Sequence, residues 1–418
     1  MDWIRNRLKE LDAAAIIVIV ALIFGALLRI GAWHQGEGRN VLGTSTDSLM
    51  YENLAKDLLA GKGYIGTDHM IARTGQQTAF YGPTYPFYLV AVHYVFGSAV
   101  EVAQASNMIL GILTAIAVFM LGSRMYGRLR GAGAAFIVAV SPQLIYYGFR
   151  LMSETLYIFL QALLLIAIVV ILKKDKPSLW ALAGTGVLFG ITYLCRQVVF
   201  VLPVILLPIW WLRYKENGYS WMAKTVGMFL VGTMLILGPW VVRNYVTFHE
   251  VMFGTTTGPA TLWWGSLEDK GYSLSLLQIK FRNEHPNMNE VQLSHLCSQE
   301  AKYNLLHLTR AEILYKIGNR PRKLLGFPRN FDDISDPQVF IGISYLTLTV
   351  LGIAGLFMGS RRRYDRILVA WFAVALLAVP LLTHVVFRYI MPVVPLLALG
   401  AANFVFIVVQ KARVSAGA

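Results

Sequence analysis

Long runs of hydrophobic residues alternate with short polar loops along this chain, and two clear runs cover residues 13–30 and 160–172. A membrane-spanning helix needs about 20 mostly apolar residues, whereas the strands of an outer-membrane barrel alternate with period two. Because the runs here are unbroken, we expect an all-α polytopic membrane protein. The pattern predicts about ten transmembrane helices, over residues 12–33, 102–121, 131–149, 153–172, 179–195, 197–212, 221–240, 341–358, 366–384 and 389–410.

Composition agrees with a membrane protein. Only 14% of the 418 residues are charged, compared with about 25% in soluble domains. The first hydrophobic run lacks a small-residue cleavage pattern, so we interpret it as an uncleaved anchor helix. The two cysteines, Cys195 and Cys297, have no metal-binding spacing, and the sequence leaves a disulfide between them open.

Basic residues gather in alternate short loops, and this pattern predicts how the chain is oriented in the membrane. Because such loops remain in the cytoplasm, we expect both termini there. The net charge of +14 then faces anionic lipid, and nucleic acid is a poor partner because no basic stretch is long or interleaved with aromatic residues. The basic residues concerned are Arg5, Arg7, Lys9, Arg124, Arg128, Arg130, Lys173, Lys174, Lys176, Arg213, Lys215, Arg361, Arg362, Arg363, Arg366, Lys411 and Arg413.

The apolar segment 84–97 is too short for an ordinary span. Counting it as a span would place every later basic loop outside, so we predict an interfacial or juxtamembrane helix. A short tilted span is the alternative that the sequence leaves open.

Two long loops are predicted on the outer face. The first, residues 34–101, contains an amphipathic helix from residue 47 to about 61, and the second, residues 241–340, contains helices near 289–308 and 310–318. We therefore divide the chain into a seven-helix module (1–240), a large outer loop (241–340) and three C-terminal transmembrane helices (341–418).

Two acidic residues at the outer face are candidates for chemistry. A carboxylate such as Asp47 can act as a general base that accepts a proton from a hydroxyl, although it could equally cap a helix. Glu154 lies at the hydrocarbon edge, where a carboxylate is costly unless it has a function or a partner, and Arg150 is four residues away.

Arginines at the same face suggest an anionic ligand. Arginine binds phosphate through two parallel hydrogen bonds and stays charged when buried. Each one alone could extend to lipid headgroups, but convergence of several on one face favours a lipid-phosphate site. The candidates are Arg73, Arg150, Arg196, Arg243 and Arg388, with His384 as a further contact to the same phosphate.

The aromatic cluster 80–86 includes Tyr81 and Tyr85. An interfacial aromatic belt and turn explain it best, and a sugar pocket is the alternative. No Walker A, GxSxG, HExxH or CxxC motif is present.

Several short motifs, taken in order along the chain, resemble the GT-C glycosyltransferases. Within that superfamily they look most like the bacterial branch related to protein O-mannosyltransferases and lipid A aminoarabinose transferases. The motifs are Asp47-x-x-x-Tyr51-x-x-Leu54, Ser141-Pro142 with Arg150-Leu-Met-Ser-Glu154, Gly238-Pro239-Trp240-x-x-Arg243-Asn244 with Gly254-Thr-Thr-Thr-Gly258, and Arg388-Tyr389-x-x-Pro392.

The resemblance implies an inverting transfer of a sugar from a polyprenyl-phosphate carrier, on the outer face of a bacterial cytoplasmic membrane. Asp47 would be the general base, and Glu154 would hold the acceptor or the surroundings of Asp47. The acceptor would be a lipid, a glycan or a protein. Contacts to donor or acceptor are expected from Tyr51, Tyr81, Tyr85, His384 and Tyr389.

The sequence departs from that family at one point. Relatives often carry a charged residue in the turn before the juxtamembrane helix, and here the turn reads Tyr81-Gly82-Pro83, so Arg73 is the candidate replacement. No cofactor is implied. No Asp-x-Asp pair lies near Asp47, so the sequence gives no support for a divalent metal.

Three rival functions remain. A flippase or transporter for a polyprenyl-linked sugar would also need outer arginines, but it requires polar groups along its path, and the cytoplasmic halves of the helices are apolar. An oligosaccharide polymerase or ligase would use a diphosphate-linked donor. A purely lipid-binding protein would explain the arginines but would leave Asp47 and Glu154 without a role.

Overall fold

The computed structural model describes residues 2–35, 42, 46–67, 70–270, 281–328, 337–358 and 363–416, with the side chains of residues 2–12, 269 and 416 left out. The predicted loop residues Arg5, Arg7, Lys9, Arg361 and Arg362 therefore fall outside the described side chains.

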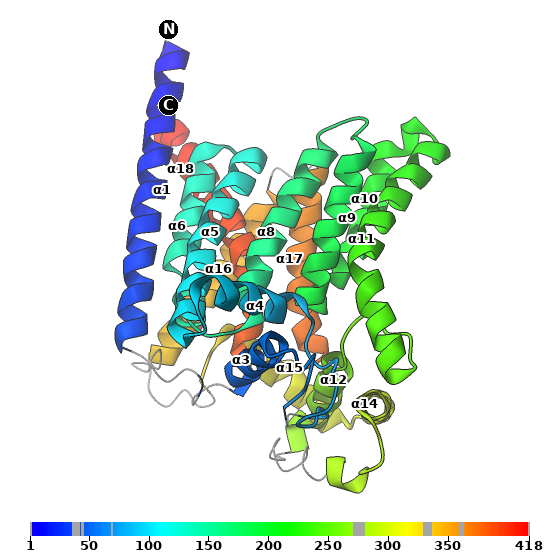
Figure 1. Cartoon of the computed structure of the whole chain (residues 1–418). Coiled ribbons are helices and arrows are strands. Elements are labelled where there is room, and N and C mark those ends of the chain that lie inside the picture. The colour runs from blue at the N-terminus through cyan, green and yellow to red at the C-terminus, as the bar shows by residue number, and fades with distance from the viewer. Residues whose placement is uncertain are drawn as a thin grey trace.

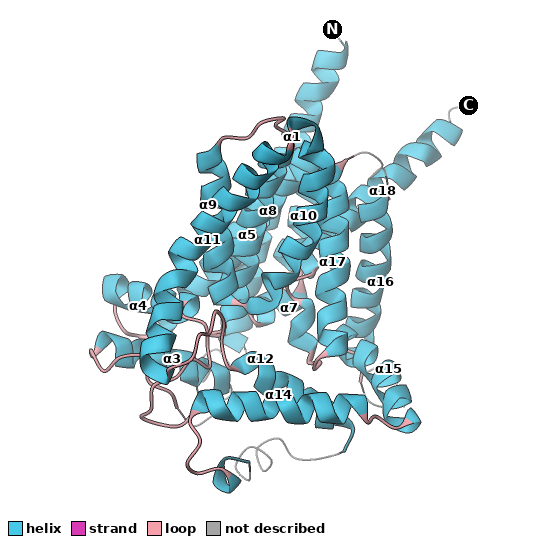
Figure 2. Cartoon of the chain, turned by 90° about the vertical axis from the view of Figure 1, so that its right-hand side faces the viewer, coloured by secondary structure: helices cyan, strands magenta, loops and turns pink. Residues whose placement is uncertain are grey.

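A bundle of roughly aligned helices forms the body of the protein (Figures 1 and 2). Each of the ten predicted spans corresponds to at least one helix, which confirms the all-α polytopic class. The bundle comprises α1 (Asp2–Gln35), α5 (Val100–Met125), α6 (Arg128–Val140), α8 (Ser153–Leu172), α9 (Leu179–Cys195), α10 (Val201–Tyr214), α11 (Tyr219–Phe248), α16 (Pro337–Phe357), α17 (Tyr364–Leu382) and α18 (Val394–Ala416).

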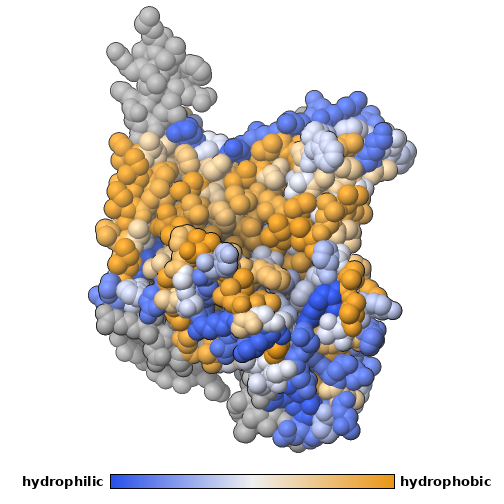
Figure 3. Space-filling view, in the orientation of Figure 1, coloured by the Kyte–Doolittle hydropathy of each residue, from blue (hydrophilic) through white to orange (hydrophobic). Residues whose placement is uncertain are grey.

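Eight helical segments in the described part of the chain are long and apolar enough to cross a membrane. Helix α9, with 17 residues, and α6, with 13, are shorter and account for the other two predicted spans. On the face shown in Figure 3, an apolar band covers the bundle, and hydrophilic residues gather above and below this band. The band is the surface expected of helices that face lipid tails.

Helices outside the bundle gather at the end opposite to both termini (Figure 1). They are α3 (Thr46–Leu59), α4 (Thr84–Phe96), α12 (Thr257–Leu267), α14 (Glu290–Leu306) and α15 (Arg310–Leu325). Helix α14 runs across the bundle axis (Figure 2). The two long predicted loops therefore build a cap of short helices over one end of the bundle.

Helix α4 has the properties predicted for the interfacial segment. It has 13 residues and lies across the helices of the bundle (Figure 1). Tyr85 and Leu89 are fully buried, whereas Tyr94 and Phe96 are 82% and 71% exposed. One face thus packs on the protein, and the other presents aromatic side chains suited to a membrane interface.

The structure differs from two of the predicted helix boundaries that lie near prolines. The predicted helix 131–149 divides at Ser141, because Pro142 disfavours a helical conformation for the residue before it; α6 ends at Val140 and α7 (Pro142–Tyr146) follows. The predicted helix 310–318 continues through Pro321 to Leu325. In the second half of this helix, Arg320 donates to the Leu381 carbonyl and Lys323 pairs with Glu268, and these contacts stabilise it.

The prediction of one helix over 389–410 was also wrong at its start. Helix α18 begins at Val394, and a 3₁₀ turn, η5 (Phe387–Ile390), precedes it. Because Pro395 occupies the first turn of α18, its missing N–H costs nothing there. His384 consequently lies between α17 and η5, not within a helix as expected.

Candidate active site

A cavity of about 660 Å³ lies where the cap meets the bundle. Its walls come from the start of α3, the 80–82 loop, the start of α8, the turn after α9, helix α12 and the turn between α17 and η5. The predicted site residues in its lining are Asp47, Tyr51, Tyr81, Glu154, Arg196, His384, Arg388 and Tyr389.

Asp47 occupies the first turn of α3, where the helix dipole favours a negative charge. Its Oδ1 accepts a hydrogen bond of 2.9 Å from the Tyr81 hydroxyl, and its Oδ2 lies 2.5 Å from Nη1 of Arg388. Residues 47 and 388 come from opposite ends of the chain. The fold therefore brings into contact a carboxylate and a guanidinium that lie far apart in the sequence.

Glu154 is the second carboxylate, in the first turn of α8, with a side chain only 2% exposed. Its Oε1 lies 2.8 Å from Nη1 of Arg196 and 3.6 Å from Nε of Arg388. Arg388 thus lies between the two acids. Burial alone would lower the pKa of Arg388, but the charges of Asp47 and Glu154 outweigh burial and raise it, so the guanidinium stays protonated.

Arg196 and Arg388 both lie at places where one long helix has ended and the next has not yet begun. Arg196 is the extended residue that terminates α9, and Arg388 lies in η5, whose Phe387 carbonyl accepts a 2.8 Å bond from Gln143 Nε2. Burial would lower the pKa of Arg196, but the Glu154 charge raises it. Ser153 Oγ accepts hydrogen bonds from Arg196 and from the Tyr51 hydroxyl, at 3.2 and 3.0 Å.

A group of tyrosines lines and supports the acidic side of the cavity. The Tyr51 ring lies 4.4 Å from that of Tyr81 and 4.9 Å from that of Tyr85. Tyr85, whose hydroxyl accepts a 2.8 Å bond from Asn107, is fully buried behind this wall and does not line the cavity. Gly82 is required beside Tyr81, because a Cβ there would lie 2.0 Å from the Leu194 carbonyl oxygen.

Three of the predicted phosphate-binding arginines lie outside the cavity lining. Arg73 donates to the carbonyls of His285 and Pro286, and thereby ties the two outer loops together. The structure therefore brings together Arg196 and Arg388 of the five candidates.

The other two arginines outside the lining have partners of their own. Arg243 donates to Gln77 at 2.8 Å and lies over the rings of Tyr64 and Trp240. Arg150 donates to the Tyr146 hydroxyl at 2.6 Å and lies over that ring. These contacts give each guanidinium a structural role that its position at a helix end did not reveal.

A charged cluster that sequence reasoning missed lies next to His384, which lines the cavity. Trp264 stacks on His384 with ring centroids 4.3 Å apart, and Glu268 lies 3.7 Å from His384 Nδ1. Glu268 also pairs with Lys323 at 2.5 Å and with Arg320 at 3.5 Å. Burial would raise the pKa of Glu268, but the neighbouring His384 and the hydrogen bond from Lys323 outweigh burial and lower the pKa to about 2.

This shift predicts a pH dependence of stability. Because the folded pKa of Glu268 lies below its usual 4.5, its contribution is present above pH 4.5 and is lost as the pH falls toward 2. We expect Glu268→Gln to lower the unfolding free energy at pH 7 by about 1 to 3 kcal/mol after allowance for solvent screening. Thermal unfolding of both proteins in detergent at pH 7, 5 and 3 should show the difference shrinking with acidification, and a constant difference would contradict the assignment.

Glu290 is a second residue that sequence reasoning missed. This buried carboxylate accepts hydrogen bonds from Thr78 Oγ1 at 2.6 Å, Ala79 N at 2.9 Å and Thr256 Oγ1 at 2.7 Å. Burial raises its pKa, while the three donors oppose that shift. It thus holds helix α14 against the two segments that carry Tyr81 and Thr257 to the cavity wall.

We expect Glu290→Gln to destabilise the cap. The carboxylate of Glu290 accepts from three donors, whereas the NH₂ group of Gln can only donate and would face one of them. A buried polar group is then left without a partner, at a cost of about 1 to 3 kcal/mol. Thermal unfolding should show a lower midpoint than in wild type, while Glu216→Gln, at an exposed residue, should leave the midpoint unchanged. Equal midpoints for all three proteins would show that Glu290 does not hold the cap.

No group of three or more His, Cys, Asp or Glu side chains in the described ranges is placed to hold a metal ion. The cavity instead combines two carboxylates and two guanidiniums with aromatic walls. Such a set can hold an anion through arginine and accept a proton through a carboxylate.

Comparisons with known proteins agree with this architecture. Residues 81–242 match the family model described as dolichyl-phosphate-mannose-protein mannosyltransferase. This range includes Tyr81, Glu154 and Arg196, whereas Asp47 and Arg388 lie beyond it. No curated protein sequence matches the chain.

Solved structures match nearly the whole chain. The Archaeoglobus fulgidus oligosaccharyltransferase in the apo form is 14% identical, with a TM-score of 0.60, over 96% of this chain and 51% of that chain. The same enzyme, AglB, in complex with an inhibitory peptide and a dolichol-phosphate matches with 14% identity, the same coverage and a TM-score of 0.59. ArnT from Cupriavidus metallidurans bound to undecaprenyl phosphate is 15% identical, over 93% of this chain and 77% of that chain, with a TM-score of 0.40.

The chain spans about half the length of the archaeal oligosaccharyltransferase. The expected resemblance is confirmed at the level of the fold. This chain is a polytopic membrane protein with a GT-C-like fold, similar to that of the archaeal oligosaccharyltransferase.

Proposed function

We propose that the protein is an inverting glycosyltransferase that moves a sugar from a polyprenyl-phosphate carrier to an acceptor at the outer membrane face. The observation that carries this proposal is the gathering of Asp47, Glu154, Arg196 and Arg388 around one cavity at the membrane edge. The match to a mannosyltransferase family model and the dolichol-phosphate bound to AglB support a lipid-phosphate carrier.

Arg388 and Arg196 are assigned to the donor phosphate. Arg388 directs Nη1 to Asp47 and Nε to Glu154, and we assign Nη2 to a phosphate oxygen of the donor. A long lipid carrier cannot leave the bilayer, so the residues that bind its phosphate must lie near the ends of the helices. Guanidiniums at that level stabilise the negative charge that builds on the leaving phosphate.

Asp47 is assigned as the general base. The acceptor hydroxyl oxygen attacks the anomeric carbon, the bond from that carbon to the phosphate oxygen breaks, and its electron pair stays on the phosphate. The hydroxyl proton passes to Asp47. A carboxylate held 2.5 Å from a guanidinium is a weak base, so the donor phosphate must also draw Arg388 away from Asp47.

Glu154 keeps Arg196 and Arg388 in place, and Tyr81 orients Asp47 through its hydroxyl. Tyr51 and Tyr389 line the same wall and are assigned to donor or acceptor contacts. His384 is assigned, with Trp264, to the acceptor side of the cavity. The acceptor is a hydroxyl of a lipid, a glycan or a protein.

The site is assigned to the outer side of a bacterial cytoplasmic membrane, with both termini in the cytoplasm. The basic loops support this orientation, and the cap lies at the end of the bundle opposite to the termini (Figure 1). In this proposal residues 1–240 form the module that carries Asp47 and Glu154, 241–340 select the acceptor, and 341–418 supply Arg388.

A reconstituted assay tests the proposal. Protein in liposomes is given a radiolabelled polyprenyl-phosphate sugar and a lipid extract as acceptor. We expect released polyprenyl phosphate to equal the labelled product in amount. Movement of the label across the bilayer without any product would replace the proposal by a flippase.

An oligosaccharide ligase is the second candidate, because the oligosaccharyltransferase AglB shares the fold. It would require a diphosphate-linked donor. The same assay run with mono- and diphosphate-linked sugars separates the two, since our proposal predicts product from the monophosphate donor. Product from the diphosphate donor alone would favour the ligase.

A further inference from the structure

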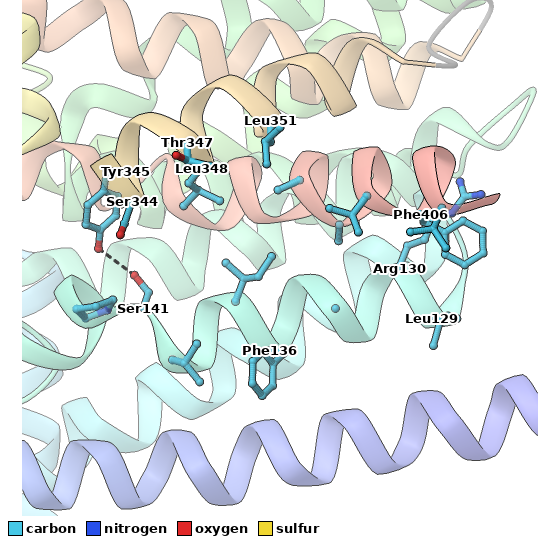
Figure 4. A pocket seen from close by; sticks show the side chains of 18 of the residues that line it. Leu129, Arg130, Phe136, Ser141, Ser344, Tyr345, Thr347, Leu348, Leu351 and Phe406 are labelled. Carbon is cyan, nitrogen blue, oxygen red and sulfur yellow. Dashed lines mark hydrogen bonds between the residues drawn. The ribbon is translucent and has the colours of Figure 1, made fainter. Parts of the chain in front are cut away.

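A second cavity lies within the bundle, between α6, α16 and α18, with a volume of about 860 Å³ (Figure 4). It shares no lining residue with the candidate active site. Its walls are mostly apolar, and the close view shows Phe136, Leu348, Leu351 and Phe406 among the side chains around it (Figure 4). We name it the α6–α18 groove.

The dimensions of the α6–α18 groove fit a lipid acyl chain. Each helix contributes residues over a stretch of about 17 Å, calculated from the 1.5 Å rise per residue for 129–140, 340–351 and 401–413. One leaflet of the hydrocarbon core is about 15 Å deep. The groove therefore extends over a depth close to that of a single leaflet.

One end of the groove carries two cations. Arg130 at the start of α6 donates to Asn403 Oδ1 at 2.9 Å and lies 4.3 Å over the Phe406 ring, so its guanidinium is held in position. Arg413 lines the same groove near the end of α18. Within the described ranges neither arginine forms an ion pair with a carboxylate.

The other end of the groove is closed by neutral polar groups. The hydroxyls of Ser141 and Tyr345 lie 3.1 Å apart there (Figure 4). The groove thus has a cationic end on the side of the chain termini and an apolar body. An anionic headgroup and its acyl chain have the matching distribution of charge.

We propose that the α6–α18 groove binds an anionic phospholipid of the leaflet on the side of the termini. The headgroup phosphate lies between Arg130 and Arg413, and an acyl chain fills the apolar walls. A zwitterionic lipid carries an ammonium that would oppose both guanidiniums, so the site selects lipids with a net negative charge. This site is independent of the sugar-transfer proposal.

Native mass spectrometry of the full chain in detergent tests the site. The probes are phosphatidylglycerol and phosphatidylcholine with identical acyl chains, supplied in equal amounts. We expect wild type to retain one phosphatidylglycerol with at least a tenfold preference, because each basic residue near the headgroup contributes roughly fivefold. Arg130→Gln/Arg413→Gln should remove the preference.

Two further variants separate the headgroup from the groove. Arg124→Gln/Arg128→Gln removes the same charge at the same membrane face but outside the groove, and it should keep the preference. Gly133→Leu should reduce retention of both lipids, because the Gly133 Cβ position has room for a side chain that would fill the groove. Thermal unfolding confirms that each variant is folded, and Arg413→Gln alone replaces the double variant if that fails.

Three results would overturn the proposal. Equal retention of both lipids by wild type would remove the charge selectivity. Loss of the preference in the Arg124→Gln/Arg128→Gln control to the same extent would show that only the overall charge matters. Added polyprenyl phosphate could instead displace phosphatidylglycerol from wild type and bind in its place. If Gly133→Leu also prevents this binding of polyprenyl phosphate, the groove belongs to the carrier lipid.

Discussion

Asp47→Asn is expected to lower the turnover number by about 10² to 10⁴-fold, the usual cost of losing a positioned general base. The amide keeps the size of the side chain and can still accept from the Tyr81 hydroxyl, but it cannot accept the acceptor's proton. Single-turnover transfer from a polyprenyl-phosphate sugar in liposomes measures the effect. Donor affinity should change much less than turnover.

The matched control for Asp47→Asn is Tyr81→Phe. It removes the hydrogen bond to Asp47 and leaves the carboxylate in place, so we expect a loss nearer tenfold. Equal and small losses in both variants would exclude Asp47 as the base. A wild-type rate in Asp47→Asn would do the same, provided that the variant unfolds at the wild-type temperature.

Arg388→Lys is expected to reduce turnover by about 10² to 10³-fold, the range found when one donor to a developing negative charge is lost. Lysine keeps the charge and can still meet one carboxylate, but it lacks the planar fork that reaches Asp47 and Glu154 while leaving Nη2 for phosphate. We also expect weaker inhibition by added polyprenyl phosphate. Both effects are measured in the same liposome assay.

Arg243→Lys supplies the matched control for Arg388→Lys. Arg243 lies at the same end of the bundle but outside the cavity, where it contacts Gln77, Tyr64 and Trp240. We expect a lower unfolding temperature with nearly unchanged inhibition by polyprenyl phosphate. The reverse pattern, with Arg243→Lys more sensitive than Arg388→Lys, would move the phosphate site away from η5.

Much of the fold could be predicted because the bilayer constrains it strongly. A spanning segment must satisfy every backbone polar group within itself, so the long hydrophobic runs indicated the helices. The short helix α4 was also expected to differ from the spans because of its length. The breaks at Ser141 and before Val394 were missed, although Pro142 and Pro392 marked both places.

The structure gathers some of the predicted site residues around one cavity and places others outside it, and both outcomes have a common cause. Single charges at an apolar membrane edge are conspicuous, and this singled out Asp47, Glu154, Arg196 and Arg388. Position at a helix end or in an outer loop does not reveal where a long side chain points, so Arg73, Arg150 and Arg243 were grouped with the site although other partners hold them outside the cavity lining.

Glu268 and Glu290 could not be identified because they lie in the large loop, where polar residues are expected. Their importance comes from burial and from partners far away in sequence, such as Lys323 for Glu268 and Thr78 for Glu290. The capping pattern at Asn289 marks the start of α14 and gave the only local signal near Glu290.

The most direct test of the central claim is a structure of the full chain in a lipid nanodisc with a polyprenyl-phosphate sugar bound. We expect the phosphate within hydrogen-bond distance of Arg388 and Arg196, with the Asp47–Arg388 pair opened and Asp47 facing the sugar. A phosphate bound elsewhere, with Asp47 still paired to Arg388, would contradict the account.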